Sequence, residues 1–232
     1  LIWSLLLVIG CGDKDGSDTG DEADADADTD TDADSDADAD ADAGLCGVWS
    51  GVVSQGSTWE YDYVGQLTGD ATIEVTSVSG SAVEFTSVSH SEAQGSITDS
   101  TSVLSYTCDS EGMWLEEIYT DYSGSAAGYK YSGWTETVYD APILVTPSSL
   151  SVGDSWTVDA SGVVTTSDGA SQPFSTTTTY EAVAEESVTV PAGTYTAIKL
   201  VSSIDGSAAA SWTAEGVGTV KTDSSELTGY TP

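Results

Sequence analysis

The stretch DATIEVTSVSGSAVEFTSVS, from Asp70 to Ser89, decides the fold. Apolar and polar residues alternate on both sides of Ser79-Gly80-Ser81, so each half is typical of a strand with one buried face. The central glycine favours a tight turn between the two halves. The stretch therefore predicts an antiparallel β-hairpin.

Similar stretches follow further along the chain, among them SWTVDASGVVTT from Ser155, FSTTTTYEAVA from Phe174 and VGTVKTD from Val217. They are rich in Thr, Val, Tyr and Trp, and short turns separate them. No stretch shows the periodicity of an amphipathic helix. The sequence predicts one all-β, mostly antiparallel domain over residues 45–232.

Two short motifs resemble each other, SQGSTW from Ser54 to Trp59 and SVGDSW from Ser151 to Trp156. Each places a Trp at the start of an expected strand, which favours two diverged β-meanders over about residues 45–140 and 148–232. Chance is the alternative, because the motif is short. Pro142 and Pro147 predict an irregular crossing loop between the halves, since proline removes a backbone donor.

The chain opens with LIWSLLLVIGCG. Residues 1–10 are apolar apart from one Ser and too few to span a bilayer, which takes about 20 residues. They are interpreted as the apolar part of a secretory signal peptide. Because no Met and no basic region stand before them, the first residues of that signal are expected to be missing from the sequence. Val8-Ile9-Gly10-Cys11 resembles the bacterial lipobox, which implies cleavage before Cys11 and a diacylglycerol on its sulfur. An ordinary signal peptide with a chance Cys is the alternative.

An acidic run follows, with fifteen Asp or Glu and one Lys between Gly12 and Gly44. It has no large apolar residue and cannot bury a core that offsets its ordering entropy. Asp-x-Asp-x-Asp can begin an EF-hand loop, but the repeat lacks the Gly and the late Glu which that loop needs. Residues 11–44 are therefore predicted to be a lipidated Cys and a disordered tether.

Charge excludes one class of partner. The chain has 39 acidic residues against four Lys and Arg together, and a net charge of −35. Such a surface repels a phosphate backbone, so nucleic-acid binding is not expected.

Apart from Cys11, the chain has two cysteines, Cys46 and Cys108. They form an even pair, and export favours a disulfide between them. Two free buried thiols are the alternative.

No residue set specifies a reaction. His90 is the single histidine, so a typical zinc site is not expected. There is no Gly-x-Ser-x-Gly elbow. The adjacent acids Glu116-Glu117 and Glu185-Glu186 point to opposite faces of a strand and form no carboxylate dyad. The protein is predicted to be no enzyme and to use no cofactor or metal.

Aromatic residues are the remaining candidates, and they are densest between Ile118 and Asp140. One hypothesis is a ligand or partner surface; the other is that these side chains fill the core of a domain with few Phe or Leu. The candidate binding residues are Tyr119, Tyr122, Tyr129, Tyr131 and Trp134.

The stretch SVTVPAGTYTAIKLVSS (187–203), followed by SWTAEGVGTVKTD (211–223), resembles the C-terminal half of uncharacterised bacterial envelope lipoproteins. The match spans about 70 residues and includes Gly153-Asp154-Ser155-Trp156 upstream. It implies a curved sheet or half-barrel, distantly similar to the Lol-type lipoprotein carriers; a β-sandwich is the alternative. Trp212-Thr213-Ala214-Glu215 departs from the pattern, in which an aromatic residue and a Pro often stand here, and the sequence shows no covering helix of the kind that carriers have.

These observations predict a lipid-anchored, non-enzymatic envelope lipoprotein. Gly12 after the lipidated Cys favours the outer membrane, by analogy with lipoprotein sorting. In one hypothesis, a concave β domain binds an apolar ligand, as a carrier does. In the other, the domain is a surface scaffold or adhesion module that binds an envelope protein or a glycan through exposed aromatics.

Overall fold

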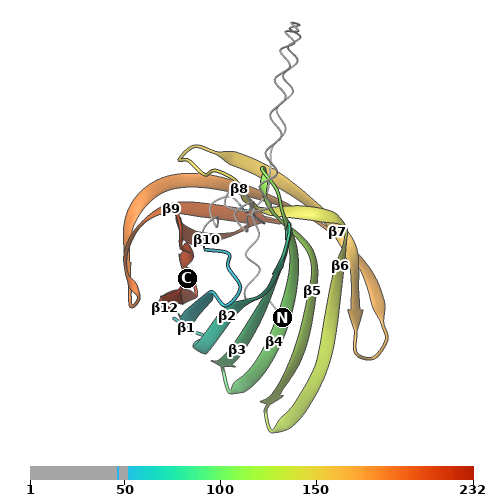
Figure 1. Cartoon of the computed structure of the whole chain (residues 1–232). Helices are drawn as coiled ribbons and strands as arrows, with labels where there is room; N and C mark the ends of the chain where they lie inside the picture. Colours follow the sequence, from blue (N-terminus) through green and yellow to red (C-terminus); the bar gives the residue numbers. More distant parts are fainter. Residues whose placement is uncertain (1–45, 47–51) are drawn as a thin grey trace, which may run out of the picture.

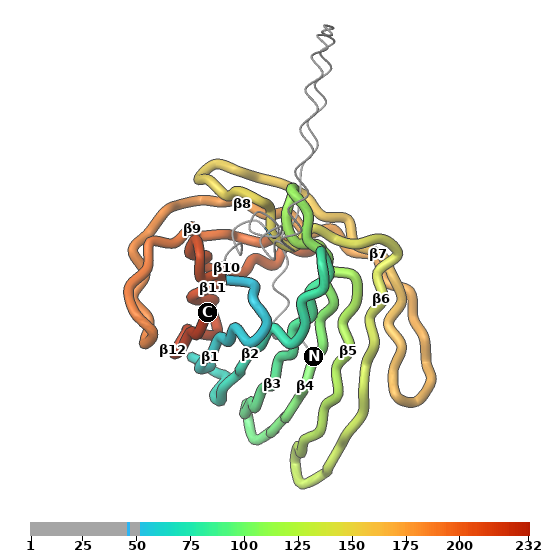
Figure 2. Tube along the Cα trace, in the orientation of Figure 1, coloured from blue at the N-terminus to red at the C-terminus, as the bar shows by residue number. Residues whose placement is uncertain are grey.

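The computed structural model describes residue 46 and residues 52–232, which form one closed antiparallel barrel (Figures 1 and 2). The expectations for residues 1–10, Cys11 and the tether lie outside the described residues. The twelve strands are β1 (Thr58–Tyr63), β2 (Thr68–Ser79), β3 (Ala82–Ala93), β4 (Ser96–Cys108), β5 (Gly112–Ala126), β6 (Tyr129–Pro147), β7 (Ser155–Thr166), β8 (Ser171–Val190), β9 (Gly193–Ile204), β10 (Ser207–Ala214), β11 (Gly218–Thr222) and β12 (Ser225–Thr231).

Each strand pairs with its neighbours in sequence, and β1 closes the barrel against β12, from Thr58 opposite Thr231 to Tyr63 opposite Ser225. Closure removes the free sheet edges that invite aggregation. The all-β, antiparallel prediction is confirmed, and the β-sandwich alternative is wrong. Residues 46 and 52–232 contain no helix long and apolar enough to cross a membrane.

The hairpin predicted from Asp70 to Ser89 is β2–β3, with Val75 opposite Phe85 and both side chains buried. A register shift between Val75 and Ser77 inserts one extra residue in β2, so strict alternation breaks at that bulge. Val88 is 52% exposed, because no such shift follows Phe85 and an odd spacing puts Val88 on the outer face.

The core lies inside the barrel and includes Trp59, Tyr61 and Phe85. Two of these side chains connect β1 to β11 and to Val217 just before it, although β11 is not a sheet neighbour of β1. Trp59 Nε1 donates to the Val217 carbonyl and the Tyr61 hydroxyl to the Thr219 carbonyl, both at 2.7 Å. Burial raises the pKa of Tyr61, so the phenol stays a neutral donor.

The two Gly-x-x-Trp motifs have the same local structure. Gly56 N donates to the Val75 carbonyl and Gly153 N to the Ala182 carbonyl, both at 2.8 Å. Both glycines have a positive φ, near 94° and 99°, which favours glycine. Trp59 on β1 and Trp156 on β7 are both buried. The two motifs therefore form the same kind of turn at the starts of β1 and β7.

The crossing loop predicted at Pro142 and Pro147 is wrong in its position, because β6 continues through Pro142 to Pro147. Between Val138 and Ile143, β6 makes no register pairs with β5, so Pro142 interrupts no ladder. Beyond Tyr139, β6 also makes no pairs with β7. Residues 148–154 make the actual connection.

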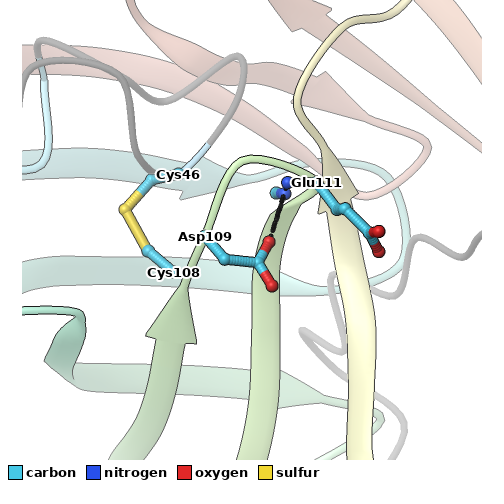
Figure 3. Close-up of a disulfide and its surroundings, with 5 residues drawn as sticks. Cys46, Cys108, Asp109 and Glu111 are labelled. Atoms are coloured by element: carbon cyan, nitrogen blue, oxygen red, sulfur yellow. Dashed lines mark hydrogen bonds between the residues drawn. A yellow bond between two sulfur atoms is a disulfide. The ribbon is translucent and has the colours of Figure 1, made fainter. Parts of the chain in front are cut away.

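The predicted disulfide is present and joins Cys46, before the barrel, to Cys108, the last residue of β4 (Figure 3). The two Cα atoms lie 4.8 Å apart, and both side chains are buried. Beside it, the backbone amides of Glu111 and Gly112 donate to Asp109 Oδ1 at 2.8 and 3.0 Å. The bond therefore fixes the chain to one end of the barrel, next to an ordered β4–β5 turn.

Candidate functional site

The five predicted aromatic residues lie on the long β5–β6 hairpin but on both of its faces. Tyr122 pairs with Gly133 and Gly124 with Tyr131, whereas Asp121 pairs with Trp134. Directly paired residues share a face, and these faces alternate along the strand. Tyr122 and Tyr131 therefore share the face that continues to the core, and Trp134 lies on the outer face with Tyr119.

The inner tyrosines cover glycines. A Cβ on Gly124 would lie 2.6 Å from the Tyr131 ring, and one on Gly133 would lie 2.7 Å from the Tyr122 hydroxyl. The two rings are 6.4 Å apart. Tyr131 also donates to the Ile97 carbonyl at 3.1 Å. Aromatic cover of this kind supports strand glycines, so Tyr122 and Tyr131 have a structural role.

Tyr129 stands apart from both pairs. It is the first residue of β6, beside the turn at Ala127 and Gly128, and it is 80% exposed. No ring contact joins it to the other aromatics of the described residues. Tyr129 is therefore a natural control position for binding experiments.

The outer pair is better placed for a ligand. Tyr119 and Trp134 stack with their centroids 6.0 Å apart and their planes at 25°. Both rings are half-exposed. The Tyr119 hydroxyl lies 3.4 Å from Asp121 Oδ1, at the long limit of a hydrogen bond. The pair therefore presents an aromatic platform with a carboxylate beside it.

This platform borders a shallow hollow of about 350 Å³ on the outer face of β2–β5. One cross-strand row runs Thr72, Val88, Thr101, Asp121 and Trp134, so Trp134 lies next to the hollow, beside its lining residue Asp121. We call this the outer hollow; its outer-face residues are Asp70, Thr72, Val88, His90, Asp99, Thr101, Asp121 and Ser123.

Among the residues that line the outer hollow, His90 is the only basic one. Its Nδ1 lies 2.7 Å from Asp99 Oδ1 and its Nε2 lies 3.5 Å from Glu92 Oε1. Asp70 faces it on β2. The hydrogen bonds to Asp99 and then to Glu92 raise the pKa of His90. At any given pH, these two carboxylates therefore favour the protonated ring more than water does.

The outer hollow combines an apolar side chain with hydrogen-bond acceptors. Exposed Val88 supplies an apolar floor, and Asp70, Asp99 and Asp121 supply hydrogen-bond acceptors. Within the described residues, no three or more His, Cys, Asp or Glu side chains could hold a metal ion together. Sequence reasoning missed Asp70, Asp99 and Val88, although the outward half of each strand's alternation was the available signal.

A second candidate lies inside the barrel. Trp156 and Tyr180 stack with their centroids 5.6 Å apart and their planes at 17°. Among the described residues, the buried Trp156 Nε1 and Tyr180 hydroxyl make no hydrogen bond of ordinary geometry, although Thr178 lies near enough to the Tyr180 hydroxyl to lower its pKa against the effect of burial. The Tyr180 side chain is 1% exposed. The neighbouring Tyr139 is also shielded from water, and this burial raises the pKa of its hydroxyl to about 12. Unpaired buried donors are costly, so this interior could accept a polar atom of a ligand.

The comparison with known proteins places this barrel in a family. The DUF3108-like family model matches residues 54–231, which contain every strand of the barrel. No curated protein and no solved structure matches the chain. The matched region covers most of the sequence, and the chain belongs to the DUF3108-like family.

Proposed function

We propose that this protein is a non-enzymatic binding module of the bacterial cell envelope that recognises a neutral glycan through the outer hollow. The observation that carries the proposal is the stacked Tyr119–Trp134 pair at the edge of a hollow lined with carboxylates. The volume of the outer hollow, about 350 Å³, falls at the lower end of the range of roughly 300–1,000 Å³ typical of ligand sites.

Glycan chemistry fits each part of the outer hollow. The C–H face of a sugar ring is apolar and slightly positive, so it packs on the negative face of Trp134. Sugar hydroxyls donate to carboxylates such as Asp121 and Asp99, and these charge-assisted bonds are strong. A neutral ligand also avoids repulsion by a chain of net charge −35.

The envelope location is supported by the sequence outside the described residues. The lipobox-like Val8-Ile9-Gly10-Cys11 supports acylation of Cys11, and Gly12 favours the outer membrane. The acidic run that follows would act as a tether between the anchor and the barrel. Metabolic labelling with an alkyne fatty acid tests the anchor: we expect label on the wild-type chain and none on Cys11→Ser. Equal labelling of both chains would contradict it.

The glycan proposal is tested by NMR of the full chain carrying Cys11→Ser, with neutral N-acetylglucosamine and glucose oligomers as probes. We expect the Trp134 indole resonance, assigned with Trp134→Phe, to shift in a saturable way. Trp134→Ala should abolish binding, while the matched Tyr129→Ala should bind like the parent chain. Equal binding by Trp134→Ala, or no shift with either probe, would overturn the proposal.

An apolar ligand inside the barrel is the second candidate, favoured by the unpaired Trp156 Nε1 and Tyr180 hydroxyl. Native mass spectrometry of the exported chain is the test. A discrete added mass that is lost on denaturation, and lost in Tyr180→Phe, would support a carrier-like function. A bare chain mass would oppose it and leave the glycan proposal unaffected, because the outer hollow lies on the other face of the sheet.

A further inference from the structure

Another aromatic residue on the outer wall, Trp212 of β10, lies between two lysines. Lys199 of β9 and Lys221 of β11 are its direct cross-strand neighbours. Their Nζ atoms lie 5.0 and 5.9 Å from the centroid of the Trp212 ring, within cation–π distance. The three side chains are half-exposed, whereas Leu200 and Val220 beside them point inward and are buried.

The acidic composition makes this arrangement unusual. The β domain contains only three lysines, Lys130, Lys199 and Lys221, and no arginine. Two of the three converge on one ring. Holding two ammonium groups near each other is unfavourable, and cation–π attraction at an exposed site compensates only in part.

Two carboxylates complete the cluster. Trp212 Nε1 donates to Glu186 Oε2 at 3.0 Å, which fixes the ring, and Lys221 Nζ lies 2.6 Å from Glu226 Oε1. Among the described residues, Lys199 has no carboxylate within ion-pair distance. The cluster therefore offers an unpaired ammonium and an aromatic ring, with carboxylates on either side.

We propose that Lys199, Trp212 and Lys221, with Glu186, bind a zwitterionic phosphate–ammonium headgroup such as phosphoethanolamine. The phosphate would accept hydrogen bonds from the two lysines. The ligand's ammonium would pair with the Glu186 carboxylate. A zwitterion suits this surface, because a purely anionic ligand would be repelled by the neighbouring acids and by the net charge of the chain.

The same chemistry has two sources, a soluble headgroup or the surface of a zwitterionic bilayer. Tryptophan and lysine side chains both favour the membrane–water interface. This site is independent of the outer hollow, since β9–β11 and β2–β5 belong to different parts of the barrel wall.

The test is NMR of the full chain carrying Cys11→Ser, titrated with glycerophosphoethanolamine, glycerol 3-phosphate or ethanolamine. We expect a saturable shift of the Trp212 indole resonance, assigned with Trp212→Phe, with the zwitterion alone. Lys199→Gln should bind it roughly tenfold more weakly, and Lys199→Gln with Lys221→Gln should not bind. The matched control Lys130→Gln changes the remaining lysine and should bind normally.

No shift with glycerophosphoethanolamine, or an equal shift in the double lysine variant, would overturn the proposal. A shift with glycerol 3-phosphate of equal affinity would overturn the zwitterion assignment. Sedimentation with phosphatidylethanolamine vesicles distinguishes the sources: pelleting that the double variant loses supports a bilayer surface. Binding of the soluble headgroup without pelleting supports a free headgroup, and both outcomes support the site.

Discussion

Removal of the disulfide should destabilise the barrel strongly. Cys46 and Cys108 are 62 residues apart in sequence, and the bond closes a loop that contains strands β1 to β4. On the chain-entropy model, a loop of this length contributes about 4 kcal/mol to the free energy of unfolding. That is a large part of the roughly 5–15 kcal/mol typical of a folded domain.

The variant is Cys46→Ala with Cys108→Ala, compared with the oxidised parent chain by urea denaturation. With an m-value of about 2 kcal/mol/M, the midpoint should fall by roughly 2 M. Because both sulfurs are buried, a mild reductant without urea should leave the parent chain unchanged. A loss below about 1 kcal/mol would refute the reasoning that this loop closure is a main source of stability.

Three further predictions concern the barrel and its single histidine. NMR titration should place the His90 pKa above 6.5, and Asp99→Asn should lower it; stabilisation by this pairing is present below pH 6.5 and lost as pH rises through the folded-state pKa. Leu227→Ala, at a fully buried position, should cost about 2–5 kcal/mol in urea denaturation. Gly112→Ala should prevent normal folding, because the added Cβ would lie 1.9 Å from the Thr146 carbonyl oxygen of β6. Circular dichroism would show the loss of β structure. Gly169→Ala, where the space is open, should cost only about 1–2 kcal/mol for its positive φ. An unshifted His90 titration, or losses at Leu227 and Gly112 no larger than at Gly169, would contradict these assignments.

The strands could be predicted because alternation is a local signal. Val75 and Phe85 identify the inner face of the first hairpin from the sequence alone, and the structure buries both. Closure of the barrel could not be predicted, because the pairing of β1 with β12 joins the two ends of the domain and leaves no local pattern. The bulge after Val75 was equally hidden, since it depends on how β3 aligns with β2.

The candidate site shows a similar division. That Tyr119 and Tyr122 lie on opposite faces follows from their odd spacing on one strand. That Tyr131 covers Gly124, and that Trp134 adjoins Asp121, depends on the register of the β5–β6 hairpin. The outer hollow needs four aligned strands, so Asp70, His90, Asp99 and Asp121 could not be grouped from a single sequence.

The central claim is that the outer hollow binds a neutral glycan beside Trp134. Its most direct test is a bacterial glycan microarray probed with three full chains carrying Cys11→Ser: the parent, Trp134→Ala and Tyr129→Ala. The account predicts binding of uncharged glycans by the parent and by Tyr129→Ala, and none by Trp134→Ala. Binding that survives in Trp134→Ala, or that Tyr129→Ala removes to the same extent, would contradict it.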